Sequence, residues 1–160
     1  MDYIMKYPSP LGELTVASDG ENIVGLWLDG QKYFAATLND EVCEKSLPVF
    51  DEVRRWLDVY FSGGEPDFTP PLAPRGSEFR RAVWAELLRI PYGETVSYGE
   101  IARRLGGKNS ARAVGGAVGH NPISVIIPCH RVVGANGSLT GYAGGVDKKI
   151  QLLQLEKAKI

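Results

Sequence analysis

The sequence is poor in residues that could cross-link the chain or bind a metal. It has two cysteines and two histidines in 160 residues, Cys43, Cys129, His120 and His130. They have neither the number and spacing of a disulfide framework nor the spacing of zinc ligands, so we expect no metal and no cofactor. No apolar run approaches the ~20 residues of a membrane span, and the first residues lack the apolar segment of a signal peptide. These absences predict a cytoplasmic protein with free thiols and no membrane partner.

The net charge of −1 conceals a strong asymmetry between the two halves of the chain. Residues 1–74 contain 5 Lys and Arg against 13 Asp and Glu, whereas residues 75–160 contain 13 against 6. A basic half of this kind is typical of a protein that binds a polyanion such as DNA. The alternative is that an acidic domain packs on a basic one within the chain. A linker rich in proline and glycine, residues 68–76, coincides with the change in charge and predicts domains at 1–74 and 75–160.

The first half predicts a small α+β scaffold domain without visible catalytic chemistry. Alternating and apolar runs bounded by turn residues indicate antiparallel strands at residues 3–7, 13–17 and 23–28. Apolar residues at helical spacing then indicate a helix at residues 48–61. Together with a mostly helical second half, the fold class is α+β: a sheet-plus-helix domain followed by a helical domain.

Two short helices in the second half have the outline of a helix-turn-helix. After an amphipathic helix that starts near Ser77, Ser97 begins a helix at residues 98–105, and Ser110 begins another at 111–118. The second of these consists of Ala, Gly and Val apart from Arg112, which suits close approach to a narrow DNA groove. Close packing in the protein core would explain the same composition.

The last stretch of the chain predicts a turn and one further helix. Residues 134–137, Gly-Ala-Asn-Gly, are typical of a hairpin turn. Asp147 is expected to cap a helix at residues 148–157. Its inward face is expected to hold Ile150, Leu153 and Leu155.

The segment Ile127–Val133 contains the most reactive group in the sequence. The thiol of Cys129 stands beside His130 and Arg131, and cationic neighbours lower the pKa of a cysteine. The apolar run at residues 123–127 predicts a buried strand that Pro128 ends. Cys129 is therefore expected to be an activated nucleophile at the end of a rigid element, with His130 contacting it directly, acting through a water or orienting another group. The competing interpretation is a small buried hydrophobic residue.

This segment resembles the active-site signature of the O6-alkylguanine-DNA alkyltransferases. The agreement extends over residues 77–156, in the same order as in the family: Ser97-Tyr98, residues 111–117, Asn121-Pro122, residues 141–145 and residues 152–156. Residues 1–74 resemble the variable N-terminal domain of the family only loosely.

The resemblance implies single-turnover DNA repair. Cys129 would accept the alkyl group of O6-alkylguanine, His130 would take its proton through a water, Glu156 would orient His130, and Tyr98 would protonate the leaving oxygen. The double-stranded DNA would be bound in its minor groove by a monomer, and the damaged base flipped into a pocket. O4-alkylthymine is a possible second substrate.

The resemblance also implies a set of DNA-binding and base-binding residues. Arg112 would fill the vacated space in the base stack, on the helix that contains Ala111 and Gly115. Asn121 would tie the helix-turn-helix to the active-site strand. The pocket would be formed by the carbonyl of Val132, the ring of Tyr142 and the N–H of Ala143.

Three other functions remain to be weighed against this one. A non-enzymatic protein that binds alkylation lesions and recruits other repair would not need Cys129. A cysteine hydrolase would need signatures that are absent from the sequence. A helix-turn-helix regulator should have polar base-reading residues where this chain has Ala111–Val118.

Overall fold

The computed structural model describes residues 1–107, 110–139 and 142–158. The chain divides into two compact units, one formed by Met1–Arg75 with Pro122–Ser124, the other by Gly76–Asn121 with Val125–Ile160. No helix within the described ranges is long and apolar enough to cross a membrane. The two units are described in turn.

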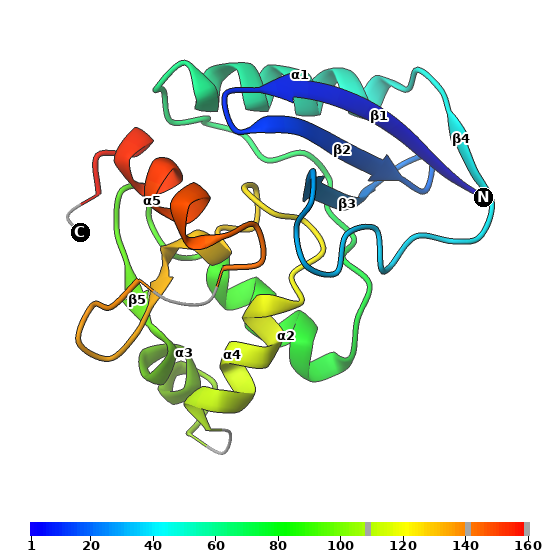
Figure 1. Cartoon of the computed structure of the whole chain (residues 1–160). Helices are drawn as coiled ribbons and strands as arrows, with labels where there is room; N and C mark the ends of the chain where they lie inside the picture. The colour runs from blue at the N-terminus through cyan, green and yellow to red at the C-terminus, as the bar shows by residue number, and fades with distance from the viewer. Residues whose placement is uncertain (108–109, 140–141, 159–160) are drawn as a thin grey trace. The chain divides into compact units, whose positions relative to one another are not determined.

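A four-stranded sheet forms the frame of the first unit (Figure 1). Its strands are β1 (Asp2–Ser9), β2 (Gly12–Ser18), β3 (Ile23–Leu28) and β4 (Val42–Glu44), in the order β3-β2-β1-β4. The first three are antiparallel and confirm the strands predicted from the sequence. The short, exposed β4 pairs parallel with β1 and was not predicted. Three residues in a polar stretch give too weak a pattern to be recognised as a strand.

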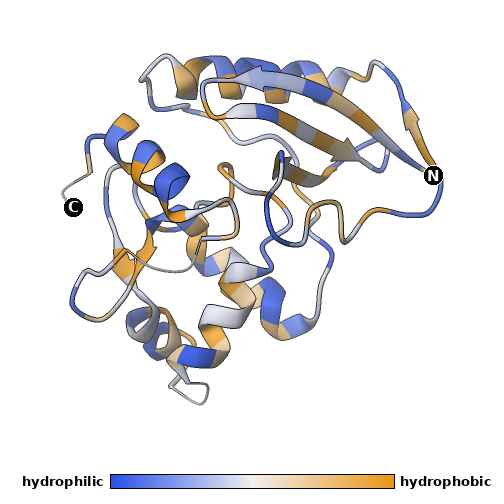
Figure 2. Ribbon diagram, viewed as in Figure 1, coloured by the Kyte–Doolittle hydropathy of each residue, from blue (hydrophilic) through white to orange (hydrophobic). Residues whose placement is uncertain are grey.

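The core of the first unit lies between the sheet and helix α1 (Pro48–Phe61), as predicted. All six residues of β3 are buried, and the apolar stripe of α1 is buried with Phe50, Val53 and Leu57 at its centre. Figure 2 shows apolar residues concentrated in β2 and β3 and alternating with polar ones along α1. Proline at the first position of α1 lacks the N–H that a helix start would leave unpaired, so α1 begins without a side-chain cap.

A short piece of the second half of the chain completes the edge of this sheet. The N–H of Leu26 donates to the carbonyl of Pro122, and the N–H of Ser124 donates to the carbonyl of Leu26, at 2.8 and 2.9 Å. The side chain of Gln31 accepts from the Ser124 hydroxyl at 3.2 Å. Residues 122–124 therefore belong to the first unit although they lie between segments of the second.

The buried strand predicted at residues 123–127 is wrong. All five residues are buried, but only Ile123 makes a β-bridge, and the chain then turns. Val125 lies in the left-handed region at φ 70°, which reverses the chain and ends any strand. An apolar run of five residues predicts burial but does not by itself establish an extended backbone.

Three helices capped by serine build most of the second unit. They are α2 (Glu78–Leu87), α3 (Tyr98–Arg104) and α4 (Ala111–Gly119). In each, the hydroxyl of the preceding serine accepts a hydrogen bond from a backbone N–H of the first turn. Side-chain oxygens at this position satisfy donors that the helix itself cannot. The helix-turn-helix outline is thus confirmed as α3 and α4.

The remaining elements are short. Strands β5 (Val96–Ser97) and β6 (Val132–Val133) pair in parallel, η1 (Cys129–Arg131) is one turn of 3-10 helix, and α5 (Val146–Leu155) ends the unit. The predicted turn at residues 134–137 is present, but β6 pairs with β5 rather than with a strand following the turn.

The start and the buried face of α5 differ from the prediction. Gly145 is its N-cap, with φ 102°, and Asp147 lies within the first turn. The buried residues are Lys149, Leu152 and Leu153, whereas Ile150 and Leu155 are only half-buried. Starting the helix two residues too late and assuming an apolar inner face concealed a buried lysine.

Candidate active site

The proposed nucleophile lies in a short turn held by its own backbone. Cys129 opens the 3-10 turn η1 directly after Pro128, and only 4% of its surface is exposed. Its N–H donates to the carbonyl of Ile127 at 2.8 Å, and the N–H of Val132 donates back to the carbonyl of Cys129. The position at the end of a strand was wrong, but the expectation that Cys129 is rigidly held agrees with these bonds.

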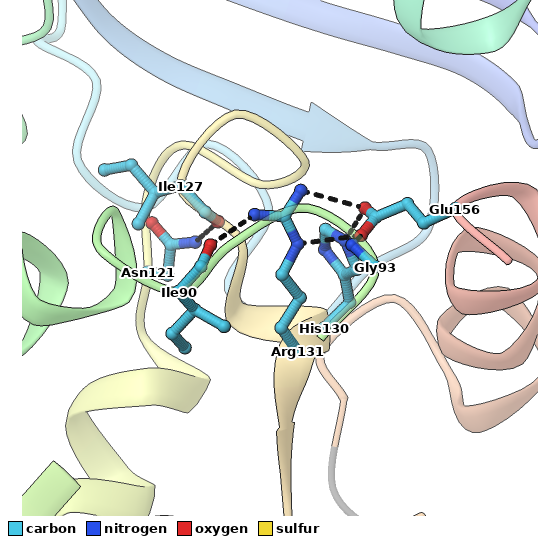
Figure 3. Close-up of polar contacts among 7 residues, drawn as sticks. All are labelled: Ile90, Gly93, Asn121, Ile127, His130, Arg131 and Glu156. Atoms are coloured by element: carbon cyan, nitrogen blue, oxygen red, sulfur yellow. Dashed lines mark hydrogen bonds and ion pairs between the residues drawn. The ribbon is translucent and has the colours of Figure 1, made fainter. Parts of the chain in front are cut away.

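Asn121 connects the end of α4 to this turn. Its Nδ2 donates to the carbonyl of Ile127 at 2.8 Å, and both groups are buried (Figure 3). The same side chain hydrogen-bonds toward the Cys129 thiol, which lowers the pKa of that thiol. Asn121 thus bridges α4 and the segment before the nucleophile, although that segment is a turn and not a strand.

A buried cluster of His130, Arg131 and Glu156 adjoins the nucleophile. Figure 3 shows the guanidinium of Arg131 between the Glu156 carboxylate and the Ile90 carbonyl. Glu156 Oε2 accepts from His130 Nε2 at 2.6 Å, and Glu156 Oε1 accepts from Arg131 Nε at 2.8 Å and from the N–H of Gly93 at 3.1 Å. Arg131 Nη2 adds a contact to Oε2 at 3.1 Å, while Nη1 donates to Ile90 at 2.8 Å. The carboxylate is therefore fixed from several sides.

These contacts set the charge of each group in the cluster. Burial would raise the pKa of Glu156, but the hydrogen bonds and charges of His130 and Arg131 outweigh it and lower that pKa to about 2. Burial lowers the pKa of His130, against the opposing pull of Glu156. At neutral pH the pair is a carboxylate and a neutral imidazole whose Nε2–H donates to it. The second ring nitrogen, Nδ1, is then the basic one.

The thiol needs such a base. Burial raises the pKa of Cys129 above its ordinary value, and the Asn121 side chain, the charge of Lys149 and the Tyr142 hydroxyl lower it in part. A thiol with a raised pKa becomes a nucleophile only if its proton is taken up nearby. A neutral histidine backed by a carboxylate is a group suited to this task.

The pairing of β5 with β6 brings Tyr98 to the nucleophile. Ser97 is the partner of Val133, and Tyr98 follows it as the first residue of α3. Burial raises the pKa of Tyr98, and the negative charge of the Cys129 thiolate raises it further. Tyr98 therefore stays protonated at neutral pH and can act as a proton donor.

Three of the residues predicted to contact DNA, Ala111, Arg112 and Gly115, lie on α4. Ala111 and Arg112 are exposed in its first turn, whereas Val114, Ala117 and Val118 are buried. Trp84 Nε1 donates to the carbonyl of Ala117 at 2.8 Å, so α2 holds the inner side of α4. The inner face of α4 packs in the core, as the second interpretation of this helix expected, and its outer face is exposed; approach of that face to a DNA groove stays a prediction.

Gly115 faces α3. A Cβ atom at this position would lie 3.8 Å from the ring of Tyr98, which is ordinary van der Waals contact. Gly115 is therefore close to a residue of the proposed site, and its place on a surface that contacts DNA stays a prediction.

The predicted pocket residues are placed unevenly. Tyr142 is buried and interacts with the Cys129 thiol, and Ala143 is half-buried beside it. Gly141, part of the same predicted loop, lies outside the described residues. The carbonyl of Val132 accepts a hydrogen bond from Lys149 Nζ at 2.5 Å. A carbonyl has two lone pairs, so this bond leaves one for another donor.

Sequence reasoning missed the part played by two cations. Arg131 was expected only as a cationic neighbour of Cys129, yet it also hydrogen-bonds Glu156 and, with His130, lowers the pKa of that carboxyl group. The burial of Lys149 was not predicted. Lys149 lies on a face of α5 that is otherwise apolar. The sequence gives little reason to expect it to be buried there, because lysine side chains are normally exposed. In the described part of the chain, no group of three or more His, Cys, Asp or Glu could hold a metal ion.

The second unit thus combines a helix-turn-helix with a buried thiol, a neutral histidine and a charged carboxylate. This combination defines a DNA-binding protein that uses a cysteine nucleophile. Residues 78–158 match the family described as 6-O-methylguanine DNA methyltransferase, DNA binding domain. Residues 3–74 match the 6-O-methylguanine DNA methyltransferase, ribonuclease-like domain.

Individual relatives agree with these matches. The chain is 46% identical over 156 residues to a methylated-DNA–protein-cysteine methyltransferase of Haemophilus influenzae, covering 97% of this chain and 86% of that one. A protein of the same name from Methanosarcina acetivorans is 45% identical, over 96% and 97% of the two chains. The crystal structure of Mycobacterium tuberculosis OGT in complex with DNA superposes with a TM-score of 0.87 at 44% identity, covering 97% and 92%. The chain belongs to the 6-O-methylguanine DNA methyltransferase family.

Proposed function

We propose that this protein repairs DNA by transferring the alkyl group of O6-alkylguanine to Cys129, once per molecule. The observation that supports this most strongly is the buried arrangement of Cys129, His130 and Glu156 in a unit that also contains a helix-turn-helix. The relatives named above act, by their names, on methylated DNA with a protein cysteine as acceptor. One of their structures contains DNA.

The reaction begins with removal of the thiol proton. Nε2 of His130 is bound to Glu156, so Nδ1 accepts the Cys129 proton through a water. The resulting imidazolium is stabilised by the Glu156 carboxylate at 2.6 Å. The thiolate then attacks the alkyl carbon attached to the guanine oxygen.

Bond formation and cleavage balance without a cofactor. The new S–C bond forms as the C–O bond breaks, and the electron pair of that bond stays on the guanine oxygen. Tyr98, kept protonated by its raised pKa, donates a proton to the departing base and regains one from the imidazolium or from solvent. The products are guanine and an S-alkylcysteine. A thioether has no easy route back to the thiol, so each molecule reacts once.

Recognition of the lesion follows from the exposed face of α4. Arg112 and Ala111 begin that helix on its open side, and we assign Arg112 to the space in the base stack that a flipped guanine vacates. Unstacking costs a few kcal/mol and least for a poorly paired base, which favours alkylated guanine. Val132, Tyr142 and Ala143 would line the pocket, and O4-alkylthymine is a second candidate substrate for it.

The two halves of the chain would divide the work. Residues 75–160 would bind DNA and catalyse transfer, and residues 1–74 would support them as a scaffold. The protein would act as a monomer in the cytoplasm, where a free thiol stays reduced.

A single substitution tests the role of the thiol. Cys129→Ala should abolish transfer from an O6-methylguanine duplex while leaving the affinity for that duplex within about twofold. The measurement is methyl transfer alongside fluorescence anisotropy of a labelled duplex. If transfer persisted in Cys129→Ala, the proposed function would be wrong. If the wild type bound the lesion without ever transferring a methyl group, the alternative of a lesion-binding protein would replace it.

A second substitution tests the role of Arg112. Arg112→Ala should slow repair of duplex DNA by about tenfold or more, while the reaction with free O6-benzylguanine should be unchanged, because the free base needs no flipping. Arg81→Ala removes an exposed arginine of α2 and serves as the matched control. Equal losses in the duplex and free-base reactions would contradict the assignment of Arg112.

A further inference from the structure

Lys149 is a buried cation next to the proposed nucleophile, with no part in the reaction described above. It lies on α5 with 0% of its surface exposed. Lysine is among the residues least often buried, because removing an ammonium from water is costly unless strong contacts replace the hydration. A lysine held in this position therefore indicates a specific interaction.

The first contact of Lys149 is a hydrogen bond to the backbone. Its Nζ donates to the carbonyl of Val132 at 2.5 Å. Val132 follows η1 directly, and its own N–H donates to the carbonyl of Cys129. Lys149, on α5, thus holds Val132, the residue that closes the turn of the nucleophile.

The second contact is electrostatic and acts on Cys129 itself. Burial raises the pKa of the Cys129 thiol, and the positive charge of Lys149 opposes that rise. Reciprocally, burial lowers the pKa of Lys149, and the charge of the Cys129 thiolate opposes that fall. Each charged form is stabilised by the other, as expected for two opposite charges in a medium of low dielectric constant.

The charge of Lys149 also favours the neutral form of the base. Burial is the main cause of the lowered pKa of His130, and the nearby positive charges of Arg131 and Lys149 add to it. A cation at this place thus stabilises the thiolate product of proton transfer, while it keeps the imidazole neutral before the transfer.

We propose that Lys149 is a positioning residue for alkyl transfer: its ammonium fixes the Val132 carbonyl at the end of the Cys129 turn and stabilises the thiolate as it forms. This deepens the proposed function and rests on it. Before transfer the charge of Lys149 is balanced by a developing thiolate, and after transfer the thioether is neutral.

Several other groups act on the Cys129 proton and must be held constant in a test. They come from each element around the turn: Tyr98 on α3, His130 and Arg131 in η1, Asn121 after α4, Tyr142 in the loop before α5, and Glu156 after α5. Substituting Lys149 alone leaves all of them in place.

The test measures the pKa of the thiol without using DNA. The ultraviolet absorption of the thiolate is recorded against pH for the wild type, Lys149→Met and Lys149→Arg, each minus the same protein with Cys129→Ser, so that Cys43 cancels. We expect Lys149→Met to raise the apparent pKa of Cys129 by about one unit and to slow methyl transfer at neutral pH about tenfold, because a unit of pKa is a tenfold change in thiolate. Lys149→Arg should restore most of the shift.

The matched control is Lys148→Met, which removes a half-exposed lysine one residue earlier on α5. It should leave both the pKa and the transfer rate unchanged. An unchanged pKa in folded Lys149→Met, or the same shift in Lys148→Met, would overturn the proposal. If wild-type protein shows the expected thiol titration but never accepts a methyl group, the proposed function fails while the role of Lys149 in the titration is still decided.

A second measurement avoids the case in which Lys149→Met fails to fold. The pKa of Lys149 is followed by NMR of its labelled Cε in the wild type and in Cys129→Ser. Loss of the thiolate should lower the pKa of Lys149 in Cys129→Ser. Identical titration of Lys149 in both proteins would contradict the coupling.

Discussion

Each of the two units buries a carboxylate against an arginine, and the two pairs differ in what surrounds them. In the first unit, Asp2 accepts from Arg75 Nη1 and Nη2 at 2.7 and 2.8 Å and from the N–H of Asn39 at 2.8 Å. These partners come from distant parts of residues 1–75 and tie the start of β1 to the end of the unit. In the second unit, Glu156 is bound by Arg131 and also by His130, next to a cysteine.

The difference shows how similar ion pairs serve different purposes. Asp2 has its bonds satisfied by residues without further chemistry, so the pair links chain segments. Glu156 shares its oxygens between a histidine and an arginine, whose hydrogen bonds together lower the pKa of the carboxyl group, and burial lowers the pKa of that histidine. A buried carboxylate that orients a titratable group in this way is typical of a catalytic site.

The sharpest way to separate the two pairs is to neutralise each carboxylate. Glu156→Gln should reduce the rate of methyl transfer by about 10²–10⁴-fold, because the imidazolium loses its counter-charge. Asp2→Asn should leave the rate per folded molecule unchanged and lower the free energy of unfolding by about 1–3 kcal/mol. The measurements are single-turnover transfer and urea unfolding. Comparable losses of transfer rate in both variants would contradict a catalytic role for Glu156 that Asp2 lacks.

A finer test replaces the arginine that holds Glu156. In Arg131→Met the pKa of Glu156 should rise from about 2, because the guanidinium that stabilises the carboxylate is gone. The transfer rate should then decline at a higher pH on acidification than in the wild type. Arg89→Met, which removes an exposed arginine paired with Glu86, is the control and should leave the pH profile unchanged. An unshifted profile in Arg131→Met would contradict the role given to Arg131.

The free energy of unfolding at acidic pH should depend on both Glu156 and Asp2. The pKa of Glu156 is about 2 in the folded protein and ordinary, near 4.5, when unfolded, so its stabilisation is fully present above that ordinary value and is lost as pH falls toward 2. Its size is on the order of 3 kcal/mol, from ~1.4 kcal/mol per unit of pKa. The free energy of unfolding should fall steeply below about pH 5 in the wild type and less steeply in Glu156→Gln. Asp2, whose pKa is lowered by Arg75, should contribute in the same direction. A wild-type curve that is flat from pH 5 to 2 would be inconsistent with both depressed pKa values.

The smallest expected effect concerns helix caps. The helix of the first unit starts at Pro48 without a side-chain cap, whereas α4 of the second relies on the Ser110 hydroxyl, which accepts from the N–H of Ala113 at 3.0 Å. Ser110→Ala should lower the free energy of unfolding by about 1 kcal/mol. Exposed Ser46→Ala should change it by less than about 0.5 kcal/mol. Equal small effects would mean that the cap does not stabilise α4.

The regular parts of the fold could be predicted from the sequence. Three strands of the first unit, α1 and the serine-capped helices each have a periodicity or a cap that acts locally. The segment at residues 123–127 could not, because its turn at Val125 and its bridge to Leu26 depend on partners distant in sequence. The apolar composition of residues 123–127 predicts that they are buried, but it does not predict the path of their backbone.

The site divides in the same way. Cys129 and His130 adjoin in sequence, so the residues alone place them in the same turn, while how the imidazole acts on the thiol stays a prediction. That Glu156 and Tyr98 meet them was inferred only from resemblance, since α5 and the β5–β6 pair bring them in from 26 and 31 residues away. The buried position of Lys149 was not predicted, because the inner face of α5 was expected to be apolar.

Mass spectrometry of the protein after incubation with excess O6-methylguanine duplex tests transfer to Cys129 most directly. We expect one methyl group per molecule, never exceeded, located on the peptide that contains Cys129 and absent from the peptide that contains Cys43. A methyl group on another residue, more than one per molecule, or no gain in mass despite repair of the duplex would contradict this expectation.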